Sequence, residues 1–327
     1  MAWLDALNEM SQLKMLILLS ASPIAPQNDV KHNATLPSLT HLEISASTAD
    51  CALALGHLDL PALTTLSITP LSPPYSDSVY DLQALLPHLA RHAHGLQDTQ
   101  PLQSMLLRSK GNNAMVHMWS VADIDVMVQD EPYSTFSATR FIPRVALFFE
   151  NVNSYGGGDA RHAILDAALL ALPLSSLDTL LVQDFTAPPK KSFWLRHAPN
   201  WPLLRRVQLQ VPAHDAFKMM LLDRPLLPLL TELVLVGYTD DWIPALKKRT
   251  EQGVPLKLLD LRMCYSREDV PLLREIVFDV LEDPSESYME AIRRWQYLIY
   301  TPFSDDDLLE GQYHMYTHGP ENDEDDD

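Results

Sequence analysis

The chain is poor in cysteine and in basic side chains, and both shortages limit what it can do. Its two cysteines, Cys51 and Cys264, lie far apart and outside any Cys-x-x-Cys spacing. They support neither a disulfide framework nor a zinc site, and we expect two reduced, half-buried thiols. Lys and Arg number 24 against 43 Asp and Glu, for a formal net charge of −19. Nucleic acids and anionic membranes are bound through basic clusters, so we expect neither as a partner.

Long hydrophobic runs are missing as well. No stretch approaches the roughly 20 apolar residues that a membrane-spanning helix needs. The first residues, MAWLDALNEMSQLKMLILLSA, place a short apolar run behind an acid-containing helical stretch. A secretory signal has a basic region in that place. We therefore expect the protein to act in the cytoplasm or the nucleus.

The apolar content is ample for a folded body, because hydrophobic residues make up 46% of the chain and charged residues only 20%. The end of the chain differs. Residues 301–327 contain ten acidic residues and no Lys or Arg, so the remainder of the chain carries about −9 of the −19. Such a composition predicts a disordered acidic tail.

One pattern recurs along the sequence: an apolar residue, two variable residues, an apolar residue, one variable residue and a third apolar residue. Successive middle residues are separated by 26, 24, 39, 40, 35, 27, 26 and 26 positions. The nine sets are Leu13/Leu16/Leu18, Leu39/Leu42/Ile44, Leu63/Leu66/Ile68, Leu102/Met105/Leu107, Ile142/Val145/Leu147, Leu177/Leu180/Val182, Leu204/Val207/Leu209, Leu230/Leu233/Leu235 and Leu256/Leu259/Leu261.

The last two apolar positions of each set alternate with variable ones, which is typical of a half-buried strand. Stretches of helical spacing separate the strands, so strand, turn, helix and turn form one coil of about 26 residues. The predicted fold is α/β: a leucine-rich-repeat solenoid, or horseshoe, over residues 13–283. It should contain nine to ten parallel strand–helix repeats, the tenth strand being the atypical segment 276–281.

The longest gaps between strands mark the irregular middle of the chain. Residues 71–100 read as an enlarged helical side of one coil. Residues 110–140 include AMVHMWSVADIDVMVQD, whose alternating apolar residues predict extra strands outside the nine-strand register. This insert is a candidate for an additional contact surface.

Both ends of the solenoid should depart from the repeat, because terminal coils cap the core. Residues 1–12 predict a short helix that forms an incomplete cap, since the outward positions Met15, Ile17 and Leu19 are all apolar. We expect upstream residues or a partner to cover them. Residues 284–300 predict a capping helix with an apolar side made of Tyr288, Ile292, Trp295 and Ile299.

Six phrases resemble the repeat region of the F-box-like proteins of mushroom-forming fungi. They are LPSLTHLEIS (36–45), LPALTTLSI (60–68), PLQSMLLRS (101–109), LPLSSLDTLLVQDF (172–185), WPLLRRVQLQ (201–210) and VPLKLLDLRMC (254–264). The resemblance covers roughly residues 10–283. It implies a part of a ubiquitin ligase component in which an F-box helical bundle binds a Skp-type adaptor and the repeats select the substrate.

The first repeat begins near Leu13, which leaves no room for an F-box ahead of it. Adaptor binding is therefore expected only if an F-box lies upstream, and no residue here is assigned to it. The resemblance implies a protein-binding, substrate-receptor-like module. The alternative is a stand-alone leucine-rich-repeat scaffold or inhibitor unrelated to ubiquitin.

Catalytic signatures are weak. His88 and His92 share a helix face, but no Glu stands between them as in a His-Glu-x-x-His zinc motif, and we expect a wet, polar helix end around them and His94. The glycines at 156–158 precede a helix without the Lys-Ser/Thr of a phosphate-binding loop. We therefore predict no enzyme, no catalytic, cofactor-binding or metal-binding residue, and no cofactor.

The predicted functional surface is the concave face of the sheet, where the variable strand positions of successive coils form columns. A mixture of apolar and charged side chains there suits the recognition of an intracellular protein partner. Arg206 and Glu232 should be cross-strand neighbours. The predicted partner-binding residues are Arg206, Gln208, Gln210, Glu232, Val234, Val236, Leu258, Asp260 and Arg262.

Overall fold

The computed structural model describes residues 2–19, 33–71, 82–110, 113–121, 143–149, 158–183, 189–223, 226–237, 241–264 and 270–282. The chain divides into two compact units, and the first comprises Met1–Ile124 and Ile142–Asp283. Every described residue belongs to this first unit. The second unit comprises Asp125–Phe141 and Pro284–Asp327, so the predicted capping helix 284–300, the tail 301–327 and most of the insert 110–140 lie outside the described residues.

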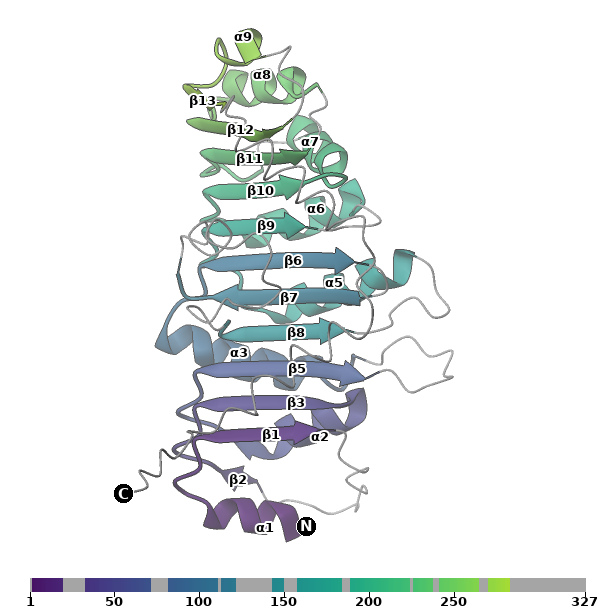
Figure 1. Cartoon of the computed structure of the whole chain (residues 1–327), viewed down its shortest axis with the longest axis vertical. Helices are drawn as coiled ribbons and strands as arrows, with labels where there is room; N and C mark the ends of the chain where they lie inside the picture. The colour runs from purple at the N-terminus through teal and green to yellow at the C-terminus, as the bar shows by residue number, and fades with distance from the viewer. Residues whose placement is uncertain are drawn as a thin grey trace, which may run out of the picture. The chain divides into compact units, whose positions relative to one another are not determined.

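The first unit is built on a mostly parallel sheet of eleven strands, which confirms the predicted α/β class (Figure 1). In spatial order the strands are β1 (Met15–Leu19), β3 (His41–Ser47), β5 (Thr65–Leu71), β8 (Val145–Phe149), β7 (Asn113–Trp119), β6 (Ser104–Lys110), β9 (Thr179–Gln183), β10 (Arg206–Gln210), β11 (Glu232–Gly237), β12 (Leu258–Cys264) and β13 (Asp279–Leu281). A second, two-stranded parallel sheet joins β2 (Ala34–Thr35) to β4 (Leu58–Asp59).

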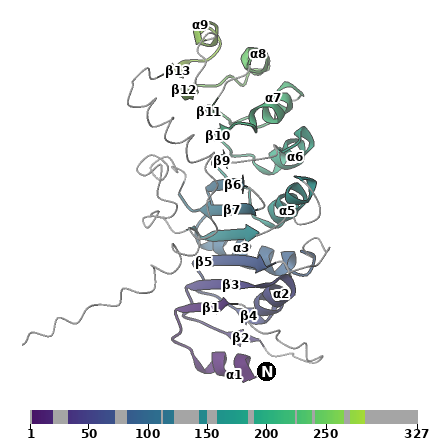
Figure 2. The same ribbon diagram turned by 45° about the vertical axis from the view of Figure 1, so that its right-hand side comes forward.

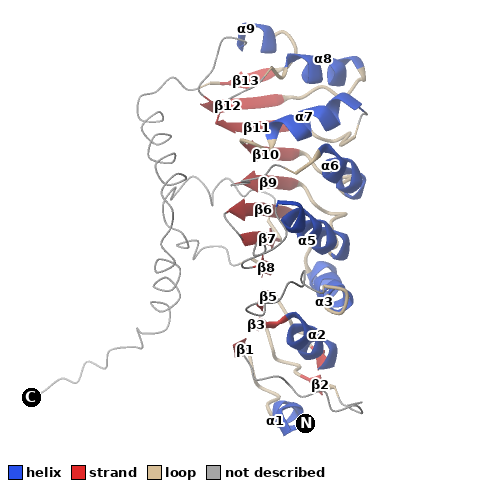
Figure 3. Ribbon diagram, turned by 90° about the vertical axis from the view of Figure 1, so that its right-hand side faces the viewer, coloured by secondary structure: helices blue, strands red, loops and turns tan. Residues whose placement is uncertain are grey.

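The described helices are α1 (Ala2–Glu9), α2 (Thr48–His57), α3 (Leu86–Thr99), α5 (Gly158–Ala171), α6 (Lys191–His197), α7 (His214–Asp223), α8 (Ile243–Glu251) and α9 (Val270–Leu273), with a 3₁₀ turn at Ala198–Asn200. Those from α2 to α8 lie along one side of the large sheet, and α1 and α9 lie at its two ends, as Figures 2 and 3 show. Consecutive helices from α5 to α8 pack on one another. The opposite side of the sheet carries the strand positions that were predicted to form the concave face, and we call it the outer face.

Local signals begin and end these helices. The Ser47 hydroxyl accepts a hydrogen bond of 3.2 Å from the Asp50 backbone N–H, which caps the start of α2. Gly253, with a φ of 78°, follows the end of α8. A left-handed residue at that place is a common way to end a helix, and glycine adopts it without steric cost.

A continuous apolar stripe faces the helices and confirms the register of the repeated pattern. Its members are paired strand by strand and are at most 1% exposed from β3 to β12. Burial of each such side chain stabilises the fold by about 1.5–3 kcal/mol. The stripe runs through Leu42, Leu66, Val145, Met118, Met105, Leu180, Val207, Leu233 and Leu259.

The strand order in the middle of the sheet differs from the prediction. The described part of the insert forms β7, which lies inside the sheet between β8 and β6 and not outside the register. β7 is antiparallel to both neighbours. Lys110 of β6 pairs with Asn113, and so short a connection allows only an antiparallel pairing of β6 with β7. As a result β8 pairs with β5, and β6 pairs with β9, out of sequence order.

Arg144 fixes β8 in this position. Its guanidinium donates through Nε to the Thr64 carbonyl at 3.0 Å and through Nη1 to the Gln100 carbonyl at 3.2 Å. The side chain is only 9% exposed, and burial lowers the pKa of its guanidinium. One buried cation therefore ties the start of β8 to the turn before β5 and to the end of α3.

The ends of the unit follow the prediction in outline. The first helix spans Ala2–Glu9, and the atypical last strand is shorter than predicted, at Asp279–Leu281, and pairs with β12. No helix in the described ranges is long and apolar enough to cross a membrane.

Candidate partner-binding surface

The structure brings the predicted surface residues onto three adjacent strands. Arg206, Gln208 and Gln210 of β10 pair with Glu232, Val234 and Val236 of β11, as predicted. Glu232 and Val234 pair in turn with Leu258 and Asp260 of β12. The side-chain column therefore continues in register across β10, β11 and the first half of β12.

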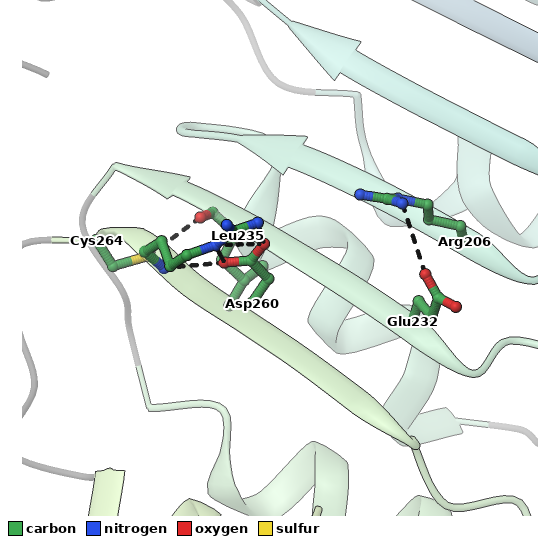
Figure 4. Close-up of polar contacts among 6 residues, drawn as sticks. Arg206, Glu232, Leu235, Asp260 and Cys264 are labelled. Carbon is green, nitrogen blue, oxygen red and sulfur yellow. Dashed lines mark hydrogen bonds and ion pairs between the residues drawn. The ribbon is translucent and has the colours of Figure 1, made fainter. Parts of the chain in front are cut away.

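Arg206 and Glu232 are the cross-strand neighbours that the sequence predicted. Arg206 Nη1 lies 3.6 Å from Glu232 Oε2, and the two side chains are 20% and 39% exposed (Figure 4). A partly exposed ion pair of this kind contributes only about 0–1 kcal/mol to stability. Its charges are accessible to solvent and are therefore accessible to a partner.

Arg262 does not continue the column that Gln210 and Val236 form. A register shift between Val234 and Val236 pairs Val236 with Met263 instead. The cause is local: Asp260 Oδ1 accepts a hydrogen bond of 3.0 Å from the Arg262 backbone N–H. A side chain that bonds its own backbone two residues on competes with the strand ladder, and the strand bulges.

Asp260 and Arg262 form a bidentate pair near this irregularity. Arg262 donates from Nε to Asp260 Oδ1 at 3.0 Å and from Nη2 to Oδ2 at 2.7 Å. The Asp260 side chain is 6% exposed and that of Arg262 is 37% exposed. The arginine therefore compensates a buried carboxylate and is the only half of the pair that reaches solvent.

Burial divides the nine predicted residues into two groups. Arg206, Glu232, Leu258 and Arg262 are accessible to some extent. The other five predicted partner-binding residues are buried and offer a partner little surface: Gln208, Gln210, Val234, Val236 and Asp260 are 3–6% exposed. Strands β3 and β5 differ, because their outer positions are all half-buried. The accessible part of the candidate surface is thus a smaller, mainly charged set.

Two of the three histidines, His88 and His92, are partly or fully buried, contrary to the expected wet helix end, whereas His94 is exposed as expected. His92 is 8% exposed and its Nε2 lies 3.1 Å from the Leu55 carbonyl oxygen. Arg91 also donates to the carbonyls of Leu55 and Leu58. Burial lowers the pKa of His88 and of His92. Among the described residues, no three His, Cys, Asp or Glu side chains gather as metal ligands would.

The two cysteines lie deeper than the half-buried positions expected from the sequence, and the glycine-rich segment is described only in part. Cys51 and Cys264 are both fully buried, and burial raises the pKa of the Cys51 thiol to about 12. Of the glycines at 156–158, only Gly158 is described, as the first residue of α5.

A buried His–Asp pair on α5 and α6 escaped the sequence analysis. His197 Nε2 lies 2.7 Å from Asp166 Oδ1, and the imidazole is stacked on Trp201 with ring centroids 6.1 Å apart. His197 is 0% exposed, and desolvation lowers its pKa against the opposing effect of Asp166. A carboxylate can orient a catalytic histidine, but His197 Nδ1 is buried without a hydrogen-bond partner. The pair therefore links α5 to α6, with the imidazole closed off from solvent.

The accessible residues Arg206, Glu232, Leu258 and Arg262, on a rigid sheet, can bind a protein surface through charge and local packing. Nothing in their chemistry points to a particular partner. No protein-family model matches the sequence, and no curated protein matches it either.

Proposed function

We propose that this chain is a leucine-rich-repeat module that binds another protein through the outer face of its sheet. The coil spacing and the common register of strands β9 to β12 support this repeat type. The six phrases that resemble fungal F-box-like proteins support a substrate-receptor-like role in a ubiquitin ligase. The expected partner is a cytoplasmic or nuclear protein, and a Skp-type adaptor joins only through an F-box upstream.

The observation that carries the proposal is the Arg206–Glu232 pair. The two charges lie on adjacent strands of a rigid sheet and are both accessible, and Glu232 also pairs with Leu258. Interfaces draw most of their binding energy from a few residues, among which arginine is common. A rigid surface also loses little entropy on binding.

A charge swap separates recognition from stability. Arg206→Glu breaks the ion pair, whereas Arg206→Glu with Glu232→Arg restores it with the charges exchanged. If the face recognises a partner, both variants lose the proteins that proximity labelling assigns to the wild type. If the pair is only structural, the double variant regains them, which contradicts the proposal.

The helix side provides a matched control. Lys191 of α6 and Asp223 of α7 form an ion pair of 2.5 Å, with side chains 34% and 42% exposed. Exchanging these two charges should leave the labelled set unchanged. Its loss, together with retention in the outer-face variants, would place the interface on the helices.

The ubiquitin link is tested separately by reading the transcript upstream of the Met1 codon and by following ubiquitylation of the labelled proteins. An F-box helical bundle in frame, and ubiquitylation that depends on this protein, support the receptor. A complete transcript without one, and unchanged ubiquitylation, support a scaffold or inhibitor.

A further inference from the structure

The turns that precede β10, β11 and β12 expose apolar side chains at equivalent places. All three strands begin at the same edge of the parallel sheet (Figure 1). The Thr231 backbone N–H donates to the Arg205 carbonyl and the Lys257 N–H donates to the Thr231 carbonyl, each at 2.8 Å, so these residues form one column across the coils. The residues two positions earlier form a second, apolar column: Leu203, Leu229 and Pro255.

This apolar column is accessible to solvent and belongs to the C-terminal coils. Leu203 is 45% exposed and Leu229 is 41% exposed, and the two are adjacent because neighbouring strands lie only about 4.7–4.9 Å apart. Three prolines beside them are exposed as well: Pro202, Pro228 and Pro255. We call these two leucines and three prolines the turn ridge.

Earlier coils hold small residues at the place of the exposed leucines. These residues are Ser38, Ala62 and Ser176. The leucines are therefore not a requirement of the turn itself. Apolar side chains that gather in one exposed patch mark an interaction site, whereas singly scattered ones need no explanation.

Basic side chains flank the turn ridge in a chain that is acidic as a whole. The Arg205 side chain is 65% exposed although its Nε lies 3.5 Å from Asp178 Oδ1, and Lys257 is exposed too. Residues 190–274 contain 14 Lys and Arg against 9 Asp and Glu, whereas the whole chain contains 24 against 43. The formal charge of this segment is therefore +5 within a chain of −19.

We propose that the turn ridge binds an acidic peptide segment of a partner protein, with aliphatic side chains on the two leucines and carboxylates beside Arg205 and Lys257. Carboxylates complement the two cations, and aliphatic side chains remove the leucines from water. A nucleic acid would satisfy the cations but would leave the ridge uncovered, and the acidic remainder of the chain would repel its phosphates. The turn ridge is separate from the outer-face residues Arg206 and Glu232, so this inference goes beyond the outer-face proposal.

Peptide selection on the full chain tests the chemistry of the ligand. A phage-displayed library of random dodecapeptides should yield sequences that combine Asp or Glu with Leu, Ile or Val. The variant Leu203→Ser with Leu229→Ser should not select them. Both leucines are exposed and Ser176 occupies the same place in an earlier coil, so this variant should fold. Selected sequences without acidic residues, or none that depend on the two leucines, would overturn the proposal.

Fluorescence polarisation with one selected peptide measures the contribution of charge. Arg205→Glu with Lys257→Glu should weaken binding roughly tenfold or more, because two attractive contacts become repulsive. Raising the salt from about 0.1 M to about 1 M shortens the Debye length from about 10 Å to about 3 Å and should weaken binding to the wild type. Lys247→Glu with Lys248→Glu makes the same change of charge on α8 and should leave binding unchanged. Equal binding by both double variants would contradict the proposal.

Two further outcomes assign the cations elsewhere. The outer-face variant Arg206→Glu with Glu232→Arg should bind the peptide as the wild type does. Loss of binding there, with retention in the leucine variant, would place the peptide on the outer face and overturn the proposal. Binding to phosphatidylserine vesicles or to poly-uridine RNA that is tighter than binding to the peptide, and that requires Arg205 and Lys257, would assign both cations to phosphates and overturn it too.

Discussion

Gly237 lies so close to Val211 that a Cβ atom added to the glycine would be 2.8 Å from Val211 Cγ2. The same glycine ends β11 with a φ of 99°, in a region that other residues rarely adopt. Both the contact and the backbone therefore require a residue without a side chain between β11 and the turn after β10.

Gly237→Ala should lower the free energy of unfolding by about 2 kcal/mol, because it adds left-handed strain to a steric clash. Gly253→Ala adds the same left-handed backbone strain but meets no atom within 4 Å, so it should lower the free energy of unfolding by only about 1 kcal/mol. Gly95→Ala, in α3 with nothing near it, should instead stabilise by about 0.5–1 kcal/mol. Urea denaturation measures all three, and equal effects would refute the assignment to Val211.

Arg249 of α8 donates hydrogen bonds to the backbone carbonyls of the turn that leads into β11. It is 0% exposed and donates to the carbonyls of Leu226, Leu227 and Leu230 at 3.2, 3.3 and 3.1 Å. Arg249→Met should destabilise the protein by about 3 kcal/mol, because the buried carbonyls lose a charged donor. Arg249→Lys keeps the positive charge but lacks the planar guanidinium with its several donors. Its stability should therefore lie between that of the wild type and that of Arg249→Met. Thermal melts that show no difference between wild type and Arg249→Met would contradict this.

The two outer-face ion pairs should respond differently to removal of the arginine. Arg262→Met leaves the buried Asp260 carboxylate without its charged donor and should cost about 1–3 kcal/mol. Arg206→Met leaves the more exposed Glu232 in contact with water and should cost at most about 1 kcal/mol. Urea denaturation of the two variants side by side compares their free energies of unfolding. A larger loss for Arg206→Met than for Arg262→Met would show that the Asp260 side chain is better solvated than its 6% exposure indicates.

Acid should destabilise the fold through His117, a half-buried histidine of β7. Burial and the nearby positive charge of Arg108 lower the pKa of His117 to about 4. In the unfolded chain the pKa is near 6.5, so between about pH 4 and 6.5 the unfolded state binds more protons and stability falls as pH falls. His117→Gln should reduce the loss between pH 7 and 4.5 by about 1–3 kcal/mol. The exposed His94→Gln is the control, and an equal effect in both would rule out this cause.

The repeat pattern predicted the apolar stripe because the side-chain period of a strand and the coil length jointly determine which residues face the helices. It did not predict the place of β7, since alternation shows that residues 113–119 form a strand but not which neighbours the strand chooses. The bulge in β12 depends on a local hydrogen bond from Arg262 to Asp260, which the spacing does not reveal.

Burial of the outer-face residues had a signal in the sequence. TLLVQ in β9 and ELVLVG in β11 are nearly continuous apolar runs, and such runs are typical of strands buried on both faces. The leucine-rich pattern predicts only alternating burial, because it specifies every second strand position. The His197–Asp166 pair needed the packing of α5 against α6, which follows from the coil order but not from any local motif.

The most direct test of the binding proposal is photo-cross-linking from single positions in the full chain. A benzophenone side chain at Glu232, on the outer face, should capture the partner identified by proximity labelling. The same group at Met219, on the helix side and similarly exposed at 45%, should not. Capture through residue 219 and none through residue 232 would contradict the account.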